Sequence, residues 1–329
     1  MSDLIPPAVP PIASHILAHL PPSPRASPLL VGIQGPQGSG KTFLTSSLQR
    51  YLSSSPHALS VCVLSIDDLY LPHALLRKVA EESKENRLLQ GRGLPGTHDI
   101  QVGGAVLRAL REGREAVLPV FEKSSNEGEG DRLPGGVRVA PPIDVMLLEG
   151  WFVGFAPLAD EELERMWEGA PGQIERSEGD ALDLRAFVRK EDIVDINRRL
   201  REYVGWWEML DVFVQLTPRP SRPISPYSLI YKWRLEQEHN MKAKNGGKGM
   251  SDDAVKSFVD RYIPGYVFFS EGVTQGTSLS SRSRISDTQN GGKGYTDPST
   301  GVRAQPRWIG KGVRVLIGEE REVVGVEEF

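Results

Sequence analysis

The chain of 329 residues has little cysteine and no excess of positive charge. Its single cysteine, Cys62, excludes an internal disulfide and is typical of a reducing compartment. Lysine and arginine number 39 against 43 aspartate and glutamate, which gives a formal net charge of −4. Contact with a phosphate backbone normally needs a clear basic excess, so no nucleic-acid partner is expected.

Long hydrophobic runs are also missing. The best apolar run, from Val145 to Leu158, is too short to cross a bilayer and carries Glu149 in its middle. The N-terminus lacks the basic segment followed by an apolar core that marks a secretory signal. The sequence therefore predicts no membrane partner and a cytoplasmic location, with the nucleus as an alternative.

What the sequence does contain is a regular alternation of apolar strands and amphipathic helices. Strands are expected over residues 28–33, 59–66, 116–121, 143–148, 212–216 and 313–317, and helices over 43–52, 72–87, 101–111, 192–210, 226–241 and 251–263. Such alternation predicts an α/β fold with a mainly parallel sheet that is covered by helices on both faces.

A glycine-rich pattern, G-x-x-x-x-G-K-[ST], lies between the first strand and the first helix. Its residues are Gly35, Pro36, Gln37, Gly38, Ser39, Gly40, Lys41 and Thr42. In this context the main-chain amides can wrap a polyphosphate, Lys41 can neutralise the β- and γ-phosphates, and the Thr42 hydroxyl can bind Mg²⁺. The pattern predicts a P-loop NTPase-type fold that uses ATP and Mg²⁺, and the alternative is a chance glycine turn.

The P-loop and the polar segments suggest how the chain is divided. Residues 1–28 contain eight prolines and are expected to form a tail, with a short helix over 12–20 as an option. Residues 29–329 are expected to form one P-loop kinase domain with two insertions. The first, near 157–192, is acidic and expected to be solvated, and the second, near 272–305, is rich in Ser, Gly and Thr.

Carboxylates follow two of the expected strands, at the edge of a parallel sheet where ligands bind. Asp67 and Asp68 end the strand 59–66, and Glu149 ends the strand 143–148. We expect Asp67 to accept the proton of an attacking hydroxyl and Glu149 to hold Mg²⁺ or its water shell. For Asp68 the favoured interpretation is a structural acid that caps the next segment.

Three further segments carry candidate groups for the acceptor and the transition state. The loop from Gly91 to Asp99 offers Arg92, His98 and Asp99, and a second loop offers Lys123 and Arg132. Arginine can bind an anion through two parallel hydrogen bonds. Arg234, on an expected helix, can close over the phosphates as a catalytic residue. The alternatives are an ordinary turn, a solvated loop and a surface arginine.

The order of these motifs resembles the plant-type D-glycerate 3-kinase family and its fungal branch of ATP-dependent kinases. The stretches that carry the resemblance lie within Leu29–Tyr266 and include residues 91–99 (GRGLPGTHD) and 149–155 (EGWFVGF). The wider relatives are uridine, pantothenate and phosphoribulo kinases, in which a carboxylate after the second strand acts as base, and Asp67 falls at that position. The resemblance implies transfer of the γ-phosphoryl group of ATP to a hydroxyl of a small acceptor, with D-glycerate as one candidate.

Two alternatives to that function remain open on the sequence. The acceptor can be a nucleoside, a pantothenate-like compound or a sugar-phosphate alcohol. The chain can also be a non-catalytic ATP-binding switch whose insertions bind partner proteins. Carboxylates at the strand ends favour chemistry over simple binding.

Overall fold

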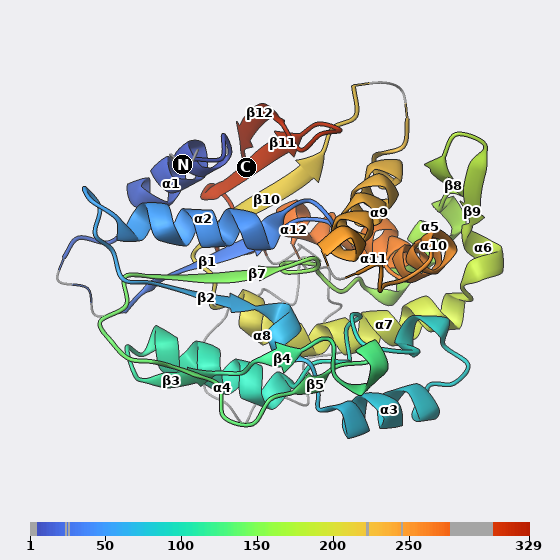
Figure 1. The fold of residues 1–329 in the computed structure, drawn as a ribbon, viewed down its shortest axis with the longest axis horizontal. Coiled ribbons are helices and arrows are strands. Elements are labelled where there is room, and N and C mark those ends of the chain that lie inside the picture. The colour runs from blue at the N-terminus through green and yellow to red at the C-terminus, as the bar shows by residue number, and fades with distance from the viewer. Residues whose placement is uncertain (1–4, 24, 26, 222–223, 245, 277–304) are drawn as a thin grey trace.

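The centre of the molecule is a six-stranded sheet in the order β12-β11-β10-β1-β7-β2 (Figure 1). The computed structural model describes residues 5–23, 25, 27–221, 224–244, 246–276 and 305–329. The strands are β1 (Leu29–Gln34), β2 (Val61–Ser65), β7 (Val145–Gly150), β10 (Val212–Pro218), β11 (Gly312–Ile317) and β12 (Val323–Glu328). Neighbouring strands are parallel except for β11 and β12. The mainly parallel α/β fold predicted from the sequence is confirmed.

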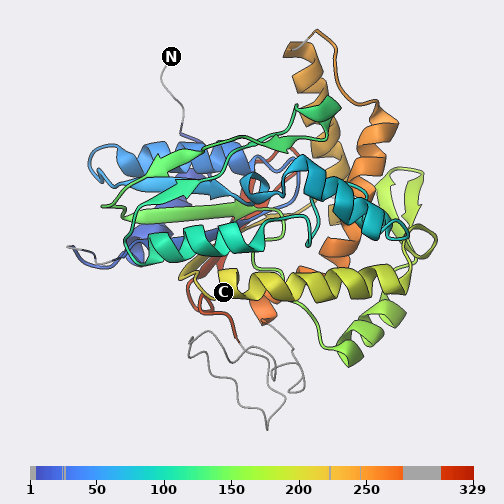
Figure 2. The same cartoon turned by 90° about the horizontal axis from the view of Figure 1, so that it is seen from below.

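The two faces of the sheet have separate hydrophobic cores. Because successive side chains of a strand point to opposite faces, Val31 of β1 packs with α1 (Val9–Ala18) and α2 (Lys41–Ser53). Leu30 belongs instead to the core formed with α4 (Ile100–Arg111) and neighbouring helices. Figure 2 shows α2 and α4 on opposite sides of the strands. Burial on both faces explains why every residue of β1 is buried.

The carboxyl ends of the parallel strands point toward a group of helices and turns. The helices at this end are α9 (Pro226–Lys244), α10 (Asp252–Asp260) and α11 (Ile263–Phe269). The 3₁₀-turn η1 (Ile66–Leu69) directly follows β2. Figure 1 shows this arrangement, with the P-loop entering α2 beside α9.

Shorter elements surround this frame. The remaining helices and 3₁₀-turns are α3 (His73–Glu82), η2 (Arg87–Leu89), η3 (Asn126–Gly128), α5 (Asp160–Gly169), α6 (Leu184–Phe187), α7 (Lys190–Leu200), η4 (Arg201–Tyr203), α8 (Val204–Trp207) and α12 (Gly272–Gln275). In the described part of the chain, three antiparallel pairs lie outside the main sheet: β3 (Ala116–Leu118) with β6 (Val137–Val139), β4 (Phe121–Glu122) with β5 (Asp131–Arg132), and β8 (Gln173–Ser177) with β9 (Asp180–Asp183). The strand expected over 116–121 is thus divided between β3 and β4, and the helix expected over 192–210 is an α7–η4–α8 succession.

The N-terminal segment and the acidic segment near residues 157–192 are packed against the domain, whereas the sequence predicted a tail and a solvated insertion. In the Pro-rich N-terminal segment, α1 buries Val9, Ile12 and Ile16 completely against the domain. In the acidic segment, α5, the β8–β9 pair and α6 fold, and they bury apolar side chains, among them Leu163 and Ile174, in the main core. The charged residues occupy the outer faces of these elements, which is why composition alone suggested solvation. Most of the second expected insertion, residues 277–304, lies outside the described residues.

None of the described helices combines the length and the apolar character that a membrane crossing requires.

Candidate active site

The P-loop joins β1 to α2 in a conformation that depends on glycine. Gly38 and Gly40 have φ angles of 73° and 86°, in the left-handed region that side chains disfavour. A Cβ atom on Gly38 would also lie 2.7 Å from the Cβ of Trp233 on α9. The loop is therefore packed directly against α9 and leaves no room for a side chain at this position.

Lys41 and two neighbouring groups show how the loop is held. The Lys41 ammonium donates to the carbonyl oxygen of Pro36 at 2.9 Å, so it folds back over its own loop. The Gln37 amide donates to the hydroxyl of Tyr266 on α11 at 3.2 Å. Arg321, in the turn between β11 and β12, donates from Nε to the carbonyl oxygen of Gly38 at 2.7 Å. The P-loop thus contacts elements that are remote in the sequence.

Glu149 ends β7 directly beside the first turn of α2. Only 4% of Glu149 is exposed, and the Thr42 hydroxyl lies 3.5 Å from its Oε1 atom. Burial raises the pKa of Glu149, although the Lys41 charge opposes that shift. Burial also lowers the pKa of Lys41, and the carboxylates of Glu149 and Asp67 oppose that shift. The four groups Thr42, Lys41, Glu149 and Asp67 therefore meet at the carboxyl edge of the sheet.

Asp67 lies in η1 and is held from two sides. The Tyr70 hydroxyl donates to Oδ1 at 2.8 Å, and the Lys123 ammonium donates to Oδ2 at 2.5 Å. Burial alone would raise the pKa of Asp67, but Lys123 and Tyr70 outweigh burial and lower it to about 2. Asp67 is consequently ionised at neutral pH. The adjacent Asp68 accepts from the Phe121 amide at 3.1 Å and so joins η1 to β4.

The candidate acceptor residues divide into two groups. Arg92 lies near the Asp67–Lys123 pair, and its Nη1 atom donates to the carbonyl oxygens of Gly128, at 2.6 Å, and Glu129. The charges of Arg92 and Asp67 both act on Lys123. The structure therefore brings together Asp67, Lys123 and Arg92.

His98, Asp99 and Arg132 make contacts within the protein, and their part in acceptor binding stays a prediction. His98 is 3% exposed, and its ring stacks on Tyr70. Its Nδ1 atom shares a hydrogen bond of 2.9 Å with the Tyr203 hydroxyl. Asp99 caps α4 by accepting from the Val102 amide at 3.0 Å. Its second oxygen pairs with Arg132 at 2.9 Å. These side chains shape the loop that lies behind Tyr70.

Arg234 is engaged on α9 itself. Its guanidinium pairs with the buried Glu238 at 2.9 Å and lies over the ring of Phe258 at 5.4 Å. The part of Arg234 that contacts the P-loop is its backbone nitrogen, 2.9 Å from the position of a Cβ on Gly38. Closure of the Arg234 side chain over the phosphates would require this pair with Glu238 to break.

Sequence reasoning missed two residues of this region, Arg261 and Tyr262, at the junction of α10 and α11. The Arg261 guanidinium donates from Nη2 to the carbonyl oxygens of Leu88 and Gly91, at 3.2 and 2.9 Å. The Tyr262 ring fills the space beside Gly93, where a Cβ would lie 2.0 Å from its hydroxyl oxygen. A signal was present, because Gly91 and Gly93 indicated that another segment approaches this loop closely.

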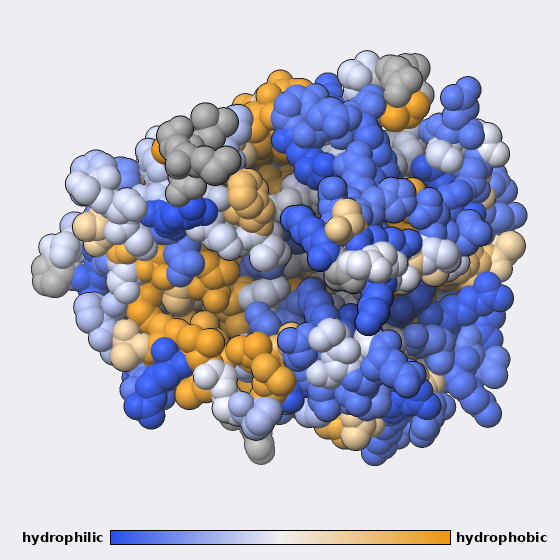
Figure 3. Space-filling view, viewed as in Figure 1, coloured by the Kyte–Doolittle hydropathy of each residue, from blue (hydrophilic) through white to orange (hydrophobic). Residues whose placement is uncertain are grey.

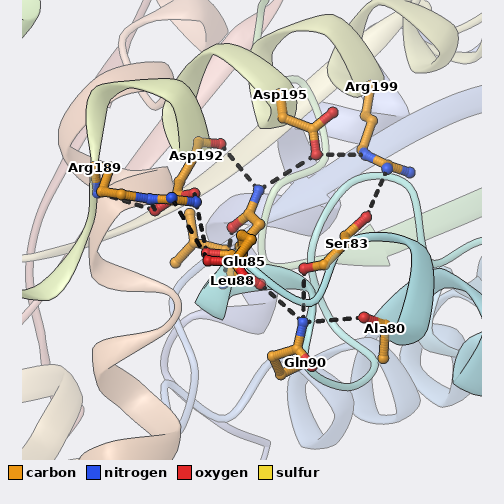
Figure 4. Close-up of polar contacts among 10 residues, drawn as sticks. Ala80, Ser83, Glu85, Leu88, Gln90, Arg189, Asp192, Asp195 and Arg199 are labelled. Atoms are coloured by element: carbon orange, nitrogen blue, oxygen red, sulfur yellow. Dashed lines mark hydrogen bonds and ion pairs between the residues drawn. The ribbon is translucent and has the colours of Figure 1, made fainter.

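A hollow is visible near the centre of the hydrophilic face in Figure 3, between α9 above and β4 below. A different cavity, of about 340 Å³, is lined by the end of α3 and by α7. Several of its charged side chains pair with one another: Arg189 pairs with Asp192 at 2.8 Å, and Arg199 pairs with Asp195 at 3.1 Å (Figure 4). Arg189 also donates to the Glu85 carbonyl oxygen, so these contacts hold α7 against the segment that follows α3.

The residues beside Lys41 fit a hard cation such as Mg²⁺. Thr42 and Glu149 supply oxygen atoms, which are the ligands that Mg²⁺ prefers, and the ion usually keeps several waters and substrate phosphates. Among the residues that the structure describes, no group of three or more His, Cys, Asp or Glu side chains could hold a metal ion without such a substrate.

A parallel sheet with a P-loop after β1, an acid near the end of β7 and a second acid after β2 defines a P-loop kinase. No family model matches the chain. It is 36% identical over 265 residues to the "Probable ATP-dependent kinase TDA10" of Saccharomyces cerevisiae, a match that covers 77% of this chain and 82% of the relative. The chain belongs to this family of ATP-dependent kinases, as the order of its motifs predicted.

Two proteins named D-glycerate 3-kinase are also similar to the chain. The solved structure of D-glycerate 3-kinase from Cryptococcus neoformans var. grubii has 34% sequence identity and a TM-score of 0.77, and the match covers 98% of this chain and 99% of that one. The chloroplastic D-glycerate 3-kinase of Arabidopsis thaliana is 32% identical over 246 residues, covering 73% of this chain and 47% of the plant protein. The prediction of an ATP-dependent kinase is confirmed.

Proposed function

We propose that the protein transfers the γ-phosphoryl group of ATP to a hydroxyl group of D-glycerate or of a very similar small hydroxy acid. The single observation that supports this most is the position of Asp67, whose ionised carboxylate lies beside Lys123 at the same sheet edge as the P-loop. The similarity to two proteins named D-glycerate 3-kinase supports the choice of acceptor.

The P-loop provides the nucleotide site in this proposal. Main-chain amides of residues 36–42 surround the phosphates, and the Lys41 ammonium leaves the Pro36 carbonyl to contact the β- and γ-phosphates. Thr42 and Glu149 would hold Mg²⁺, which when bound neutralises charge on the phosphate oxygens. Burial of Glu149 strengthens the interaction of its carboxylate with any cation beside it.

Asp67 orients the acceptor. Each of its carboxylate oxygens accepts one hydrogen bond from the protein, so each keeps a lone pair for the acceptor hydroxyl. The hydroxyl oxygen bonds to the γ-phosphorus, the bond from that phosphorus to ADP breaks, and the hydroxyl proton passes to Asp67. A pKa of about 2 makes Asp67 a weak base while Lys123 is bound to it. Its main contribution is therefore positioning, with proton acceptance late in the transfer.

The test is a product-detecting kinase assay on the purified full chain with ATP, Mg²⁺ and a panel of alcohols. D-glycerate should give a phosphorylated product, whereas a switch protein would bind ATP and give none. Asp67→Asn should lower kcat by roughly 10²- to 10⁴-fold with little change in ATP affinity.

Asp68→Asn is the matched control, because the new amide oxygen can still accept from the Phe121 amide. It should keep most of the parent turnover. Equal losses in the two variants would remove Asp67 from its proposed role, and a panel without any phosphorylated product would refute the kinase reaction on these acceptors.

A further inference from the structure

Two arginine side chains lie close together near Asp67, and neither pairs with a carboxylate among the described residues. The Nη1 atom of Arg92 and the Nη2 atom of Arg261 both donate to backbone carbonyl oxygens. The carbonyl oxygen of Arg92 is itself 3.3 Å from Nη2 of Arg261. Burial lowers the pKa of Arg261, and the charge of Arg92 lowers it further. Two guanidinium groups in this arrangement repel each other and lack an acidic partner.

The donors of Arg261 are only partly used by the protein. Its Nη2 atom donates to the carbonyl oxygens of Leu88, Gly91 and Arg92. Its Nε atom, in contrast, is buried and has no hydrogen-bond partner in the described structure. A buried donor without a partner costs roughly 1–3 kcal/mol, so such a group normally has a reason to persist. An anionic ligand would supply both the missing acceptor and the missing negative charge.

The surroundings of Arg261 place this positive charge on the acceptor side of the site. Its charge acts on Tyr70 and Tyr262, and the Tyr70 hydroxyl donates to the Asp67 carboxylate. Lys123, a nearby cation, is already paired with Asp67. Lys41, also near Asp67, lies on the nucleotide side and donates to the Pro36 carbonyl oxygen. Arg132, which sequence reasoning offered as an anion binder, is paired with Asp99. Arg92 and Arg261 are thus two cations on the acceptor side of the site that have no carboxylate partner among the described residues.

We propose that Arg261, together with Arg92, binds the carboxylate group of the acceptor and makes the enzyme selective for hydroxy acids over neutral polyols. The proposal rests on the proposed function for the identity of the acceptor. Arginine suits this role because its planar group can hold both oxygens of a carboxylate. With the carboxylate fixed at the arginines, a hydroxyl on the same small molecule can reach Asp67.

The first experiment compares D-glycerate with glycerol, which lacks the carboxylate, as acceptors for the parent chain and for Arg261→Gln. Loss of a hydrogen bond to a charged group should raise the KM for D-glycerate roughly 10- to 100-fold. The KM for ATP and the low turnover of glycerol should stay within about twofold of the parent. Preference for the acid should therefore fall by the same factor as its KM rises.

Gln90→Ala is the control for loosening of the loop without a change of charge. The Gln90 side chain donates to the carbonyl oxygens of Ala80, Ser83 and Asn86, and so supports the segment that leads into Gly91 (Figure 4 draws Gln90 with Ala80 and Ser83). It should lower the melting temperature more than it changes acceptor preference. If Gln90→Ala and Arg261→Gln change the KM for D-glycerate equally, or if glycerol loses as much as D-glycerate, Arg261 only supports the loop and the proposal is wrong.

Direct binding separates this proposal from the proposed function. Titration calorimetry of the full chain with D-glycerate should show binding that Arg261→Gln weakens, even if no product forms. Such a result would keep the carboxylate site and refute only the kinase reaction on this acceptor. Absence of D-glycerate binding to a parent that phosphorylates a neutral alcohol would refute the carboxylate site alone.

Arg261→Lys covers the case in which Arg261→Gln does not fold. Lysine keeps the charge and one donor for the loop, but it loses the planar group. The KM for D-glycerate should then lie above that of the parent, with the melting temperature close to it. An unchanged KM in a folded Arg261→Lys protein would contradict recognition through the planar group.

Discussion

Replacing Arg321 by glutamine removes a side chain that ties three parts of the nucleotide site together. Its guanidinium donates to the Gly38 carbonyl oxygen at 2.7 Å and to the Trp233 carbonyl oxygen at 3.2 Å, and it pairs with Glu236 at 2.8 Å. It also lies over the Trp233 ring at 5.6 Å. These contacts join the β11–β12 turn, α9 and the P-loop.

The size of the effect follows from these contacts. The charged hydrogen bond to Gly38 is worth about 1.5–3 kcal/mol, and the partly exposed pair with Glu236 adds roughly 0.2–1 kcal/mol. Since the first contact acts on the P-loop itself, we expect its loss to appear as weaker ATP binding. A loss of about 1.4 kcal/mol corresponds to tenfold in affinity, so Arg321→Gln should raise the KM for ATP roughly tenfold or more.

The assay is steady-state kinetics with ATP varied at saturating acceptor, together with thermal melting of the same samples. Lys232→Gln is the matched control, because Lys232 pairs with Glu320 on the same turn at 2.5 Å and does not contact the P-loop. It should leave the KM for ATP near the parent value. The reasoning is refuted if Arg321→Gln lowers the melting temperature while the KM for ATP stays unchanged, or if both variants raise that KM equally.

Two further predictions concern stability. His98 is buried with its pKa lowered to about 3, whereas an unfolded histidine titrates near 6.5, so below pH 6.5 the unfolded chain takes up a proton that the folded chain refuses. From this group alone, the free energy of unfolding should therefore fall by on the order of 1–2 kcal/mol between pH 7 and pH 5. Urea unfolding of His98→Asn should show a weaker dependence of that free energy on pH. The same dependence in the variant and the parent would contradict a buried, neutral His98. Arg176 binds Asp260 with two hydrogen bonds, at 3.0 and 2.6 Å, and Asp260 is 4% exposed. Arg176→Ala should lower the free energy of unfolding, measured in urea, by about 3–5 kcal/mol. The double variant Arg176→Ala/Asp260→Ala should recover part of that loss. A loss below about 1 kcal/mol in Arg176→Ala would show that the pair is dispensable.

Local patterns were sufficient to predict the sheet and the position of the two acids at its carboxyl edge. The buried strand before Gly35 and the helix after Lys41 gave the P-loop, and parallel topology then placed Asp67 and Glu149 at the same edge. These predictions succeeded because each depends on residues that are close together in the chain. Burial of α1 was harder to foresee, since its apolar side chains face partners on α2 and the sheet that a local pattern does not reveal.

Choices between side-chain partners could not be predicted from the sequence. Arg132 and Arg261 look alike as exposed cations in polar segments, yet Arg132 pairs with Asp99 and Arg261 has no carboxylate partner among the described residues. Arg234 was expected near the phosphates, but a buried acid four residues later on the same helix, Glu238, holds its side chain. Which of several possible partners a long charged side chain takes depends on the packed structure around it.

The contact between Gly38 and Arg321 spans 283 positions of the chain, and this has a consequence for protein synthesis. β1 also pairs with β7 and β10, which are translated much later. A nascent chain that has just exposed the glycine loop outside the ribosome lacks the neighbours that hold this loop in shape. Since long-range contacts of this kind form late, full affinity for nucleotide should arise only after the β11–β12 turn has emerged. Before that point, weak nucleotide binding would give the growing polypeptide little stabilisation.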